Sequence, residues 1–158
     1  MELNTTGMLF YGGPMFPKEM VNYLNNLNID RLTIVDVGCC MADFKKDLNP
    51  LLNKPTFWVG IDPADHGIGS QYNVFINKAV MNTPSEKIID FYVYSDLGCN
   101  SIKRMKTEII THDVAEFDTK WYVNRNIETL YETRKVSANS LKNLLNPLVL
   151  DQIHVLKI

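Results

Sequence analysis

The residues with the clearest chemical potential follow a short apolar run, in the stretch TIVDVGCCMADF at positions 33–44. An acid, Asp36, stands two residues before Gly38, and the adjacent cysteines Cys39 and Cys40 come directly after. A strand that turns into a helix leaves unpaired backbone N–H groups at the helix N-terminus, and a glycine lets a ligand approach them closely. Three interpretations compete here: a loop that cradles a nucleotide, a redox or metal site, and an ordinary strand-to-helix connection.

A second acid follows the next apolar run. Asp62, in TFWVGIDP, stands 24 residues after Gly38. In dinucleotide-binding folds, an acid about 20 residues beyond the glycine-rich turn accepts hydrogen bonds from ribose hydroxyls. The dinucleotide pattern G-x-G-x-x-G is not present here, because Cys40 and Ala42 occupy the alternate positions after Gly38. In addition, the Asp36 carboxylate would repel a pyrophosphate. The two acids therefore favour a ligand with vicinal hydroxyls over a dinucleotide.

The cysteines and histidines do not show the spacing of a metal site. The chain has three cysteines and three histidines, with no C-x-x-C pair and with histidines scattered along its length. This spacing predicts no metal ion and reduced thiols, with Cys39 and Cys40 serving as small packing residues. The alternation of QIHVLKI predicts that His154 is a hydrogen-bonded histidine on a strand rather than a base.

Hydrophobic periodicity predicts an α/β fold in which these acids lie at strand ends. Two strands flank a helix within about 30 residues, the size of a βαβ unit with parallel strands. Both acids would then lie at the same edge of the sheet. The expected helices are 16–28, 44–52 and 140–148, and the expected strands are 31–38, 56–63, 73–80, 88–94, 128–137 and 152–158.

Composition sets the class of protein. With 158 residues and 46% hydrophobic content, the chain can bury one core, so we expect one domain over 1–158. A net charge of −2 without charged blocks argues against capture of nucleic acid or of an anionic membrane. No apolar window reaches the roughly 20 residues that span a bilayer, and no leader pattern opens the chain, so a cytoplasmic location and small-molecule or protein partners are expected.

These motifs carry a family resemblance. IVDVGCCMADF resembles the first motif of FkbM-type class I S-adenosylmethionine-dependent methyltransferases, and VGIDP is similar to their acid-proline second motif. Further stretches of the chain resemble the later elements of the family in the same order: FINKAVMN, DFYVYSDLGCNSI, VSANSLKNLL and LDQIHVLKI. The resemblance covers residues 33–158 as a cofactor-binding half and leaves 1–30 as an N-terminal helical lead-in.

The resemblance implies a Rossmann-like methyltransferase fold, with a mostly parallel central sheet and flanking helices, that is incomplete at the C-terminus. It also implies S-adenosylmethionine as cofactor and transfer of its methyl group to a hydroxyl of a small molecule or sugar. Asp36 and Gly38 would lie near the methionine portion, and Asp62, followed by Pro63, would bind the ribose. By the same resemblance, Cys39 and Cys40 would line the cofactor, and Asn77 and Ala79 would flank the adenine. No residue is assigned as catalytic base.

The sequence also departs from the family pattern. Cys40 stands in place of the usual asparagine, Ala42 in place of the second glycine and Lys142 in place of an aspartate, and the sequence ends at Ile158 before the family's acid and glycine. These departures support an alternative: a truncated or degenerate methyltransferase-like domain that acts as a non-catalytic binding or assembly module. Such a module would form a homo-oligomer through an unfinished sheet edge. A nicotinamide-dependent oxidoreductase is a third interpretation, disfavoured by the missing glycines.

Overall fold

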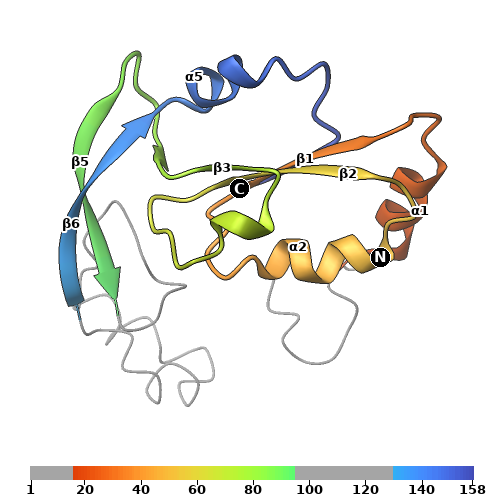
Figure 1. Cartoon of the computed structure of the whole chain (residues 1–158), viewed down its shortest axis with the longest axis horizontal. Helices are drawn as coiled ribbons and strands as arrows, with labels where there is room; N and C mark the ends of the chain where they lie inside the picture. Colours follow the sequence, from red (N-terminus) through yellow and green to blue (C-terminus); the bar gives the residue numbers. More distant parts are fainter. Residues whose placement is uncertain (1–15, 95–129) are drawn as a thin grey trace, which may run out of the picture.

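The computed structural model describes residues 16–94 and 130–158, which form two β-sheets with flanking helices (Figure 1). The larger sheet has four strands in the order β3-β2-β1-β7, and all of its pairs are parallel. Its strands are β1 (Leu32–Val37), β2 (Thr56–Ile61), β3 (Val74–Ile76) and β7 (Val155–Lys157). The predicted α/β class with a parallel central sheet and flanking helices is confirmed.

The order of the strands reverses at β1. Strands β2 and β3 extend the sheet on one side of β1, whereas β7 pairs with its other side through Ile34 and Val155. Asp36 of β1 lies opposite Gly60 of β2, so the carboxyl ends of the two strands share one edge. In open parallel sheets, the edge at such a reversal is where ligands bind.

Helices cover both faces of the larger sheet, which explains why β1 is buried along most of its length and both β1 and β2 are mostly apolar rather than alternating. Helices α1 (Lys18–Asn26) and α2 (Asp43–Leu48) pack on one face, around the buried Ile34 and Trp58. Helix α5 (Leu141–Leu145) packs on the other face, around Val35 and Val59 (Figure 1). No helix of the described ranges has the length and apolar character to cross a bilayer.

Two predicted elements have different boundaries in the structure. The expected helix 44–52 ends as an α-helix at Leu48 and continues as the 3₁₀ turn η1 (Asn49–Leu51), which contains Pro50. The single strand expected at 73–80 is wrong. It divides into β3 and β4 (Ala79–Val80), which belong to different sheets, because a turn bonds Lys78 N–H to the Ile76 carbonyl at 2.9 Å.

The second sheet has the order β4-β6-β5. Strand β5 (Lys87–Tyr94) pairs antiparallel with β6 (Leu130–Asn139), and β4 pairs parallel with β6. The predicted strand 88–94 is confirmed as β5, and the strand predicted at 128–137 is found as β6, with positions 128–129 of that prediction outside the described residues. Residues 95–129, including the end of the DFYVYSDLGCNSI motif and Cys99, lie outside the described residues.

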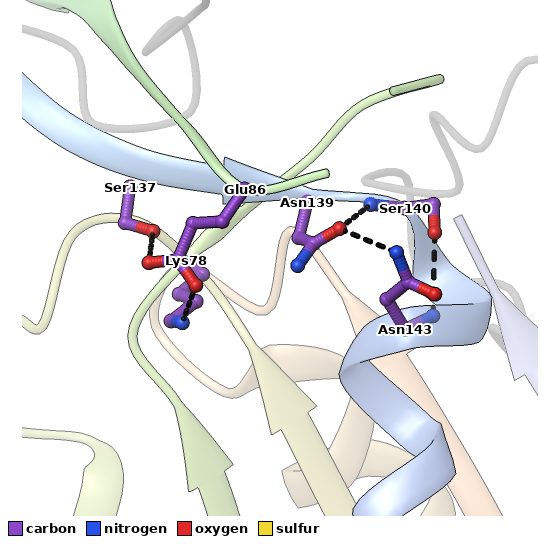
Figure 2. Close-up of polar contacts among 6 residues, drawn as sticks. All are labelled: Lys78, Glu86, Ser137, Asn139, Ser140 and Asn143. Atoms are coloured by element: carbon purple, nitrogen blue, oxygen red, sulfur yellow. Dashed lines mark hydrogen bonds and ion pairs between the residues drawn. The ribbon is translucent and has the colours of Figure 1, made fainter. Parts of the chain in front are cut away.

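A polar network fastens the end of β6 to the start of α5 (Figure 2). The Asn139 side-chain oxygen accepts hydrogen bonds from the backbone N–H of Ser140 at 2.8 Å and from the Asn143 side-chain amide at 2.9 Å. Ser140 caps the helix by accepting the Asn143 N–H at 3.3 Å. Just before β5, Glu86 accepts a hydrogen bond from the Ser137 hydroxyl and pairs with Lys78 at 2.7 Å. These contacts hold the chain at the point where it leaves strand β6 of the second sheet and enters helix α5, which covers the larger sheet.

A glycine in the middle of β2 makes room for a buried tyrosine. The 3₁₀ turn η2 (Gly69–Gln71) leads into Tyr72, whose ring lies against Gly60. A Cβ added at Gly60 would lie 2.7 Å from the Tyr72 ring, which is closer than real Cβ contacts. Glycine in a strand interior commonly marks such a close approach.

Replacing Gly60 with alanine should therefore destabilise the protein by overpacking. For Gly60→Ala we expect a loss of about 1 to 3 kcal/mol in the free energy of unfolding, measured by urea denaturation. In a Tyr72→Ala background, the same substitution should cost less than about 1 kcal/mol, because the ring that it strikes is absent. Equal costs in both backgrounds would contradict this contact.

Candidate functional site

A cavity of about 380 Å³ opens at the carboxyl ends of β1 and β7, where the strand order reverses. Its floor includes the loop that follows β1, and Lys157 of β7 contributes a cation. Aromatic rings of Phe16 and Phe44 line it with their centroids 5.4 Å apart. The lining residues are Phe16, Gly38, Cys39, Cys40, Met41, Asp43, Phe44 and Lys157.

The loop after β1 is held in an uncommon backbone conformation. Gly38, Cys40 and Ala42 have φ angles of +67°, +35° and +60°. For residues other than glycine, this left-handed region costs about 1 to 3 kcal/mol each, so the surroundings must hold the loop in place. The Gly38 N–H donates to the Ile61 carbonyl at 2.8 Å, and the Cys40 N–H donates to Asp62 Oδ2 at 2.9 Å.

Asp62 joins the loops that follow β1 and β2. Its side chain is 6% exposed, and its second oxygen accepts the Ala64 N–H at 2.8 Å. The Asn77 side-chain amide donates to the Asp62 backbone carbonyl at 3.0 Å, which also ties down the end of β3. Each carboxylate oxygen has two lone pairs, so both can accept one further hydrogen bond. Asp62 does not itself line the cavity, but through the Cys40 N–H it positions the loop that does.

Asp36 is fully buried and engaged by two side chains. The Tyr72 hydroxyl donates to Asp36 Oδ2 at 2.7 Å, and the Lys157 ammonium lies 3.0 Å from Asp36 Oδ1. The ammonium also donates to the backbone carbonyls of Val37 at 3.0 Å and Gly38 at 2.8 Å. Because Lys157 both lines the cavity and contacts Asp36, it links the buried acid to the cavity.

The structure brings together part of the predicted set of site residues. Gly38, Cys39 and Cys40 line the cavity, and Asp36 and Asp62 contact lining residues. Asp36 and Asp62 do not line the cavity themselves, and neither do the other three predicted residues, Pro63, Asn77 and Ala79. Ala79 is buried in the second sheet, where it pairs with Ala138, because the chain leaves the larger sheet after β3.

Several residues of the site were missed by the sequence analysis. Lys157 and Tyr72 belong to segments that read as an apolar strand and a glycine-marked turn, and only the fold brings them to Asp36. Gly60 carried a usable signal, since a glycine inside an apolar strand indicates a close neighbour. The prediction of His154 as a hydrogen-bonded histidine is confirmed, since its Nδ1 accepts the Thr33 N–H at 2.9 Å, but the residue lies just before β7 rather than on the strand.

The two thiols of the site are poorly suited to nucleophilic chemistry. Burial, and after it the carboxylates of Asp36 and Asp62, raises the pKa of the Cys39 thiol to about 12. Burial and the Asp62 carboxylate also raise the pKa of the Cys40 thiol. Thiolates are the reactive and metal-binding form, so both thiols stay protonated and unreactive near neutral pH. Among the described residues, no group of three or more His, Cys, Asp or Glu side chains could hold a metal ion.

Comparisons with family models, with curated proteins and with solved structures each find no match to this chain. The α/β class therefore rests on the parallel sheet and its flanking helices. The function has to be argued from the chemistry of the residues at the carboxyl ends of β1, β2 and β7.

The raised pKa values predict slow alkylation of the folded protein. In iodoacetamide at pH 8, we expect Cys39 to react at least about 100-fold more slowly than in the same protein unfolded in urea, because the reactive thiolate is scarce. The rate at Cys39 should rise with pH until the pH approaches about 12. Peptide mass spectrometry of timed samples measures both rates, and equal rates in the folded and unfolded protein would contradict the assignment.

Proposed function

We propose that the chain binds S-adenosylmethionine in this cavity and transfers a methyl group to a hydroxyl of a small molecule or sugar. The observation that carries the proposal is the position of the cavity at the carboxyl edge where the parallel strand order reverses. Ligands of doubly wound α/β folds bind at this edge. The Rossmann-like methyltransferase fold is part of the same proposal.

The groups around the cavity suit the parts of this molecule. Phe16, Phe44 and Met41 supply an apolar wall. The Asp43 carboxylate also lines the cavity; its ion pair with Lys46, at 3.7 Å, is exposed and therefore weak, so the carboxylate can also face a sulfonium or ammonium group. Asp62 lies behind Cys40 and has one lone pair on each oxygen left for a ribose hydroxyl. The combination matches a cationic nucleoside better than an anionic one.

The same geometry disfavours a dinucleotide. A pyrophosphate needs free backbone N–H groups at the turn after the first strand. Here the Cys40 N–H already donates to the Asp62 carboxylate, which places a negative charge where a phosphate would lie. The nicotinamide-dependent alternative therefore has little support from the site.

The chain's own contribution to methyl transfer would be positioning. The bound cofactor would supply an electrophilic methyl group on a sulfonium: the acceptor oxygen would bond to the methyl carbon in line as the carbon–sulfur bond breaks and the neutral thioether leaves. Holding that oxygen near the methyl can provide a large part of the acceleration. A group that takes the acceptor's proton is needed as well, and the protonated thiols of Cys39 and Cys40 do not fill that role.

One observation favours the second candidate, a non-catalytic assembly module. Within the described residues, β7 pairs with β1 alone, and the apolar side chains of Leu156 and Ile158 on or beside it are 44% and 85% exposed. An uncovered edge strand can pair with a strand of another chain. Light scattering after size-exclusion chromatography separates the candidates, because a stable monomer that binds the cofactor would argue against assembly.

Binding of S-adenosylmethionine tests the proposed function directly. Isothermal titration calorimetry should give a saturable heat with S-adenosylmethionine and with S-adenosylhomocysteine, and none with NAD. Asp62→Asn should weaken the affinity about tenfold or more, because it removes a charged acceptor from the ribose hydroxyls.

The matched control is Asp65→Asn, a change to an exposed acid in the same loop whose side chain accepts the Gly67 N–H. This variant should bind S-adenosylmethionine as the unmodified protein does. A folded sample that gives no heat with S-adenosylmethionine would overturn the proposal. Equal weakening by both substitutions would remove the role assigned to Asp62.

A further inference from the structure

The contacts of Lys157 describe a formed binding site for an ammonium ion. Its Nζ lies 3.0 Å from Asp36 Oδ1, 3.0 Å from the Val37 carbonyl and 2.8 Å from the Gly38 carbonyl. The ammonium donates hydrogen bonds to the two backbone carbonyls, and its charge pairs with the Asp36 carboxylate without a hydrogen bond to Oδ1. The site is therefore built from the end of β1 and filled by a cation that β7 supplies.

The acceptors of this site need a cation whatever its source. The Asp36 carboxylate is fully buried, and the Tyr72 hydroxyl satisfies its other oxygen without neutralising its charge. Leaving a buried charge without its partner is strongly unfavourable. A neutral or anionic molecule therefore cannot replace the Lys157 ammonium, whereas a second ammonium can.

Lys157 is also placed so that it can leave. Its side chain is 32% exposed and lines the cavity, and the short strand β7 that carries it lies at the edge of the larger sheet. A lysine has a flexible four-carbon stem, so its ammonium can swing toward solvent without a change in the backbone. The space that it vacates joins the cavity, because Gly38 and Lys157 both line it.

We propose that Lys157 is an internal competitor, whose ammonium fills a cation site that accepts the primary ammonium of a ligand once the lysine swings out. The identity of that ligand as the amino-acid end of S-adenosylmethionine rests on the proposed function, whereas the site itself does not. Entry of the ligand then requires exchange of one ammonium for another. Molecules that lack a cationic amine are rejected. For molecules that have one, the apparent affinity is the intrinsic affinity multiplied by the fraction of time that Lys157 leaves the site free.

The test removes the lysine and returns its ammonium as a free molecule. The Lys157→Ala substitution removes the lysine side chain beyond Cβ, and n-propylammonium has the same atoms as the part removed. Propylammonium chloride should raise the thermal unfolding midpoint of this variant in a saturable way, and should leave the unmodified protein at the level of a sodium chloride control. Tetramethylammonium, which has no N–H donors, should have no effect beyond that control. The double variant Asp36→Asn, Lys157→Ala lacks the buried charge and should show no rescue.

If Lys157→Ala does not fold in plain buffer, the same titration is run as refolding, followed by circular dichroism. Recovery of the folded signal in propylammonium supports the site. The proposed site is overturned if propylammonium gives no rescue, if tetramethylammonium rescues equally well, or if the double variant is rescued as well.

A separate experiment tests whether S-adenosylmethionine is the ligand that competes with Lys157. In calorimetry, Lys157→Ala should bind S-adenosylmethionine about tenfold more tightly than the unmodified protein, because no internal competitor must leave. Equal or weaker binding would overturn the competition. If propylammonium rescues the variant but neither protein binds S-adenosylmethionine, the ammonium site is supported and the proposed function is refuted. The failure of one proposal can therefore be distinguished from the failure of the other.

Discussion

The buried carboxylate of Asp36 is the constraint on which the rest of the site depends. A fully buried acid on the central strand β1 requires partners, and it takes them from two distant parts of the chain: the Tyr72 hydroxyl after η2 and the Lys157 ammonium on β7. Because breaking a buried ion pair is costly, this requirement holds β7 beside β1. Gly60 completes the arrangement by leaving room for the tyrosine ring.

The second acid has a different task from the first. Asp62 is bonded to the backbone of Cys40 and Ala64, so it holds the left-handed loop after β1 against the turn after β2. The two acids together make an edge that is negative near the cavity floor and neutral at Asp36, where Lys157 balances the charge. This distribution is the basis of the proposal that the cavity binds a cationic nucleoside rather than a pyrophosphate.

The sequence was informative where local pattern decides the structure. The apolar runs ending at Val37 and Ile61, the helix that follows Gly38 and the bonded His154 could all be predicted, because periodicity and turn residues act over short distances. The single strand predicted over 73–80 shows where this reasoning failed, since a turn at Lys78 moves the chain into a second sheet through pairing with the distant β6. Lys157 and Tyr72 could not be assigned either, because their partner Asp36 is chosen by the tertiary fold.

The central claim is that one cavity, at the carboxyl ends of β1 and β7, receives a cationic nucleoside. Titration of isotope-labelled protein with S-adenosylmethionine, followed by amide NMR spectroscopy, tests this claim most directly. The account predicts saturable shifts at Gly38, Cys40, Met41 and Lys157, with the amides of β5 and β6 unchanged. Shifts confined to the second sheet, or a spectrum that S-adenosylmethionine does not alter, would contradict it.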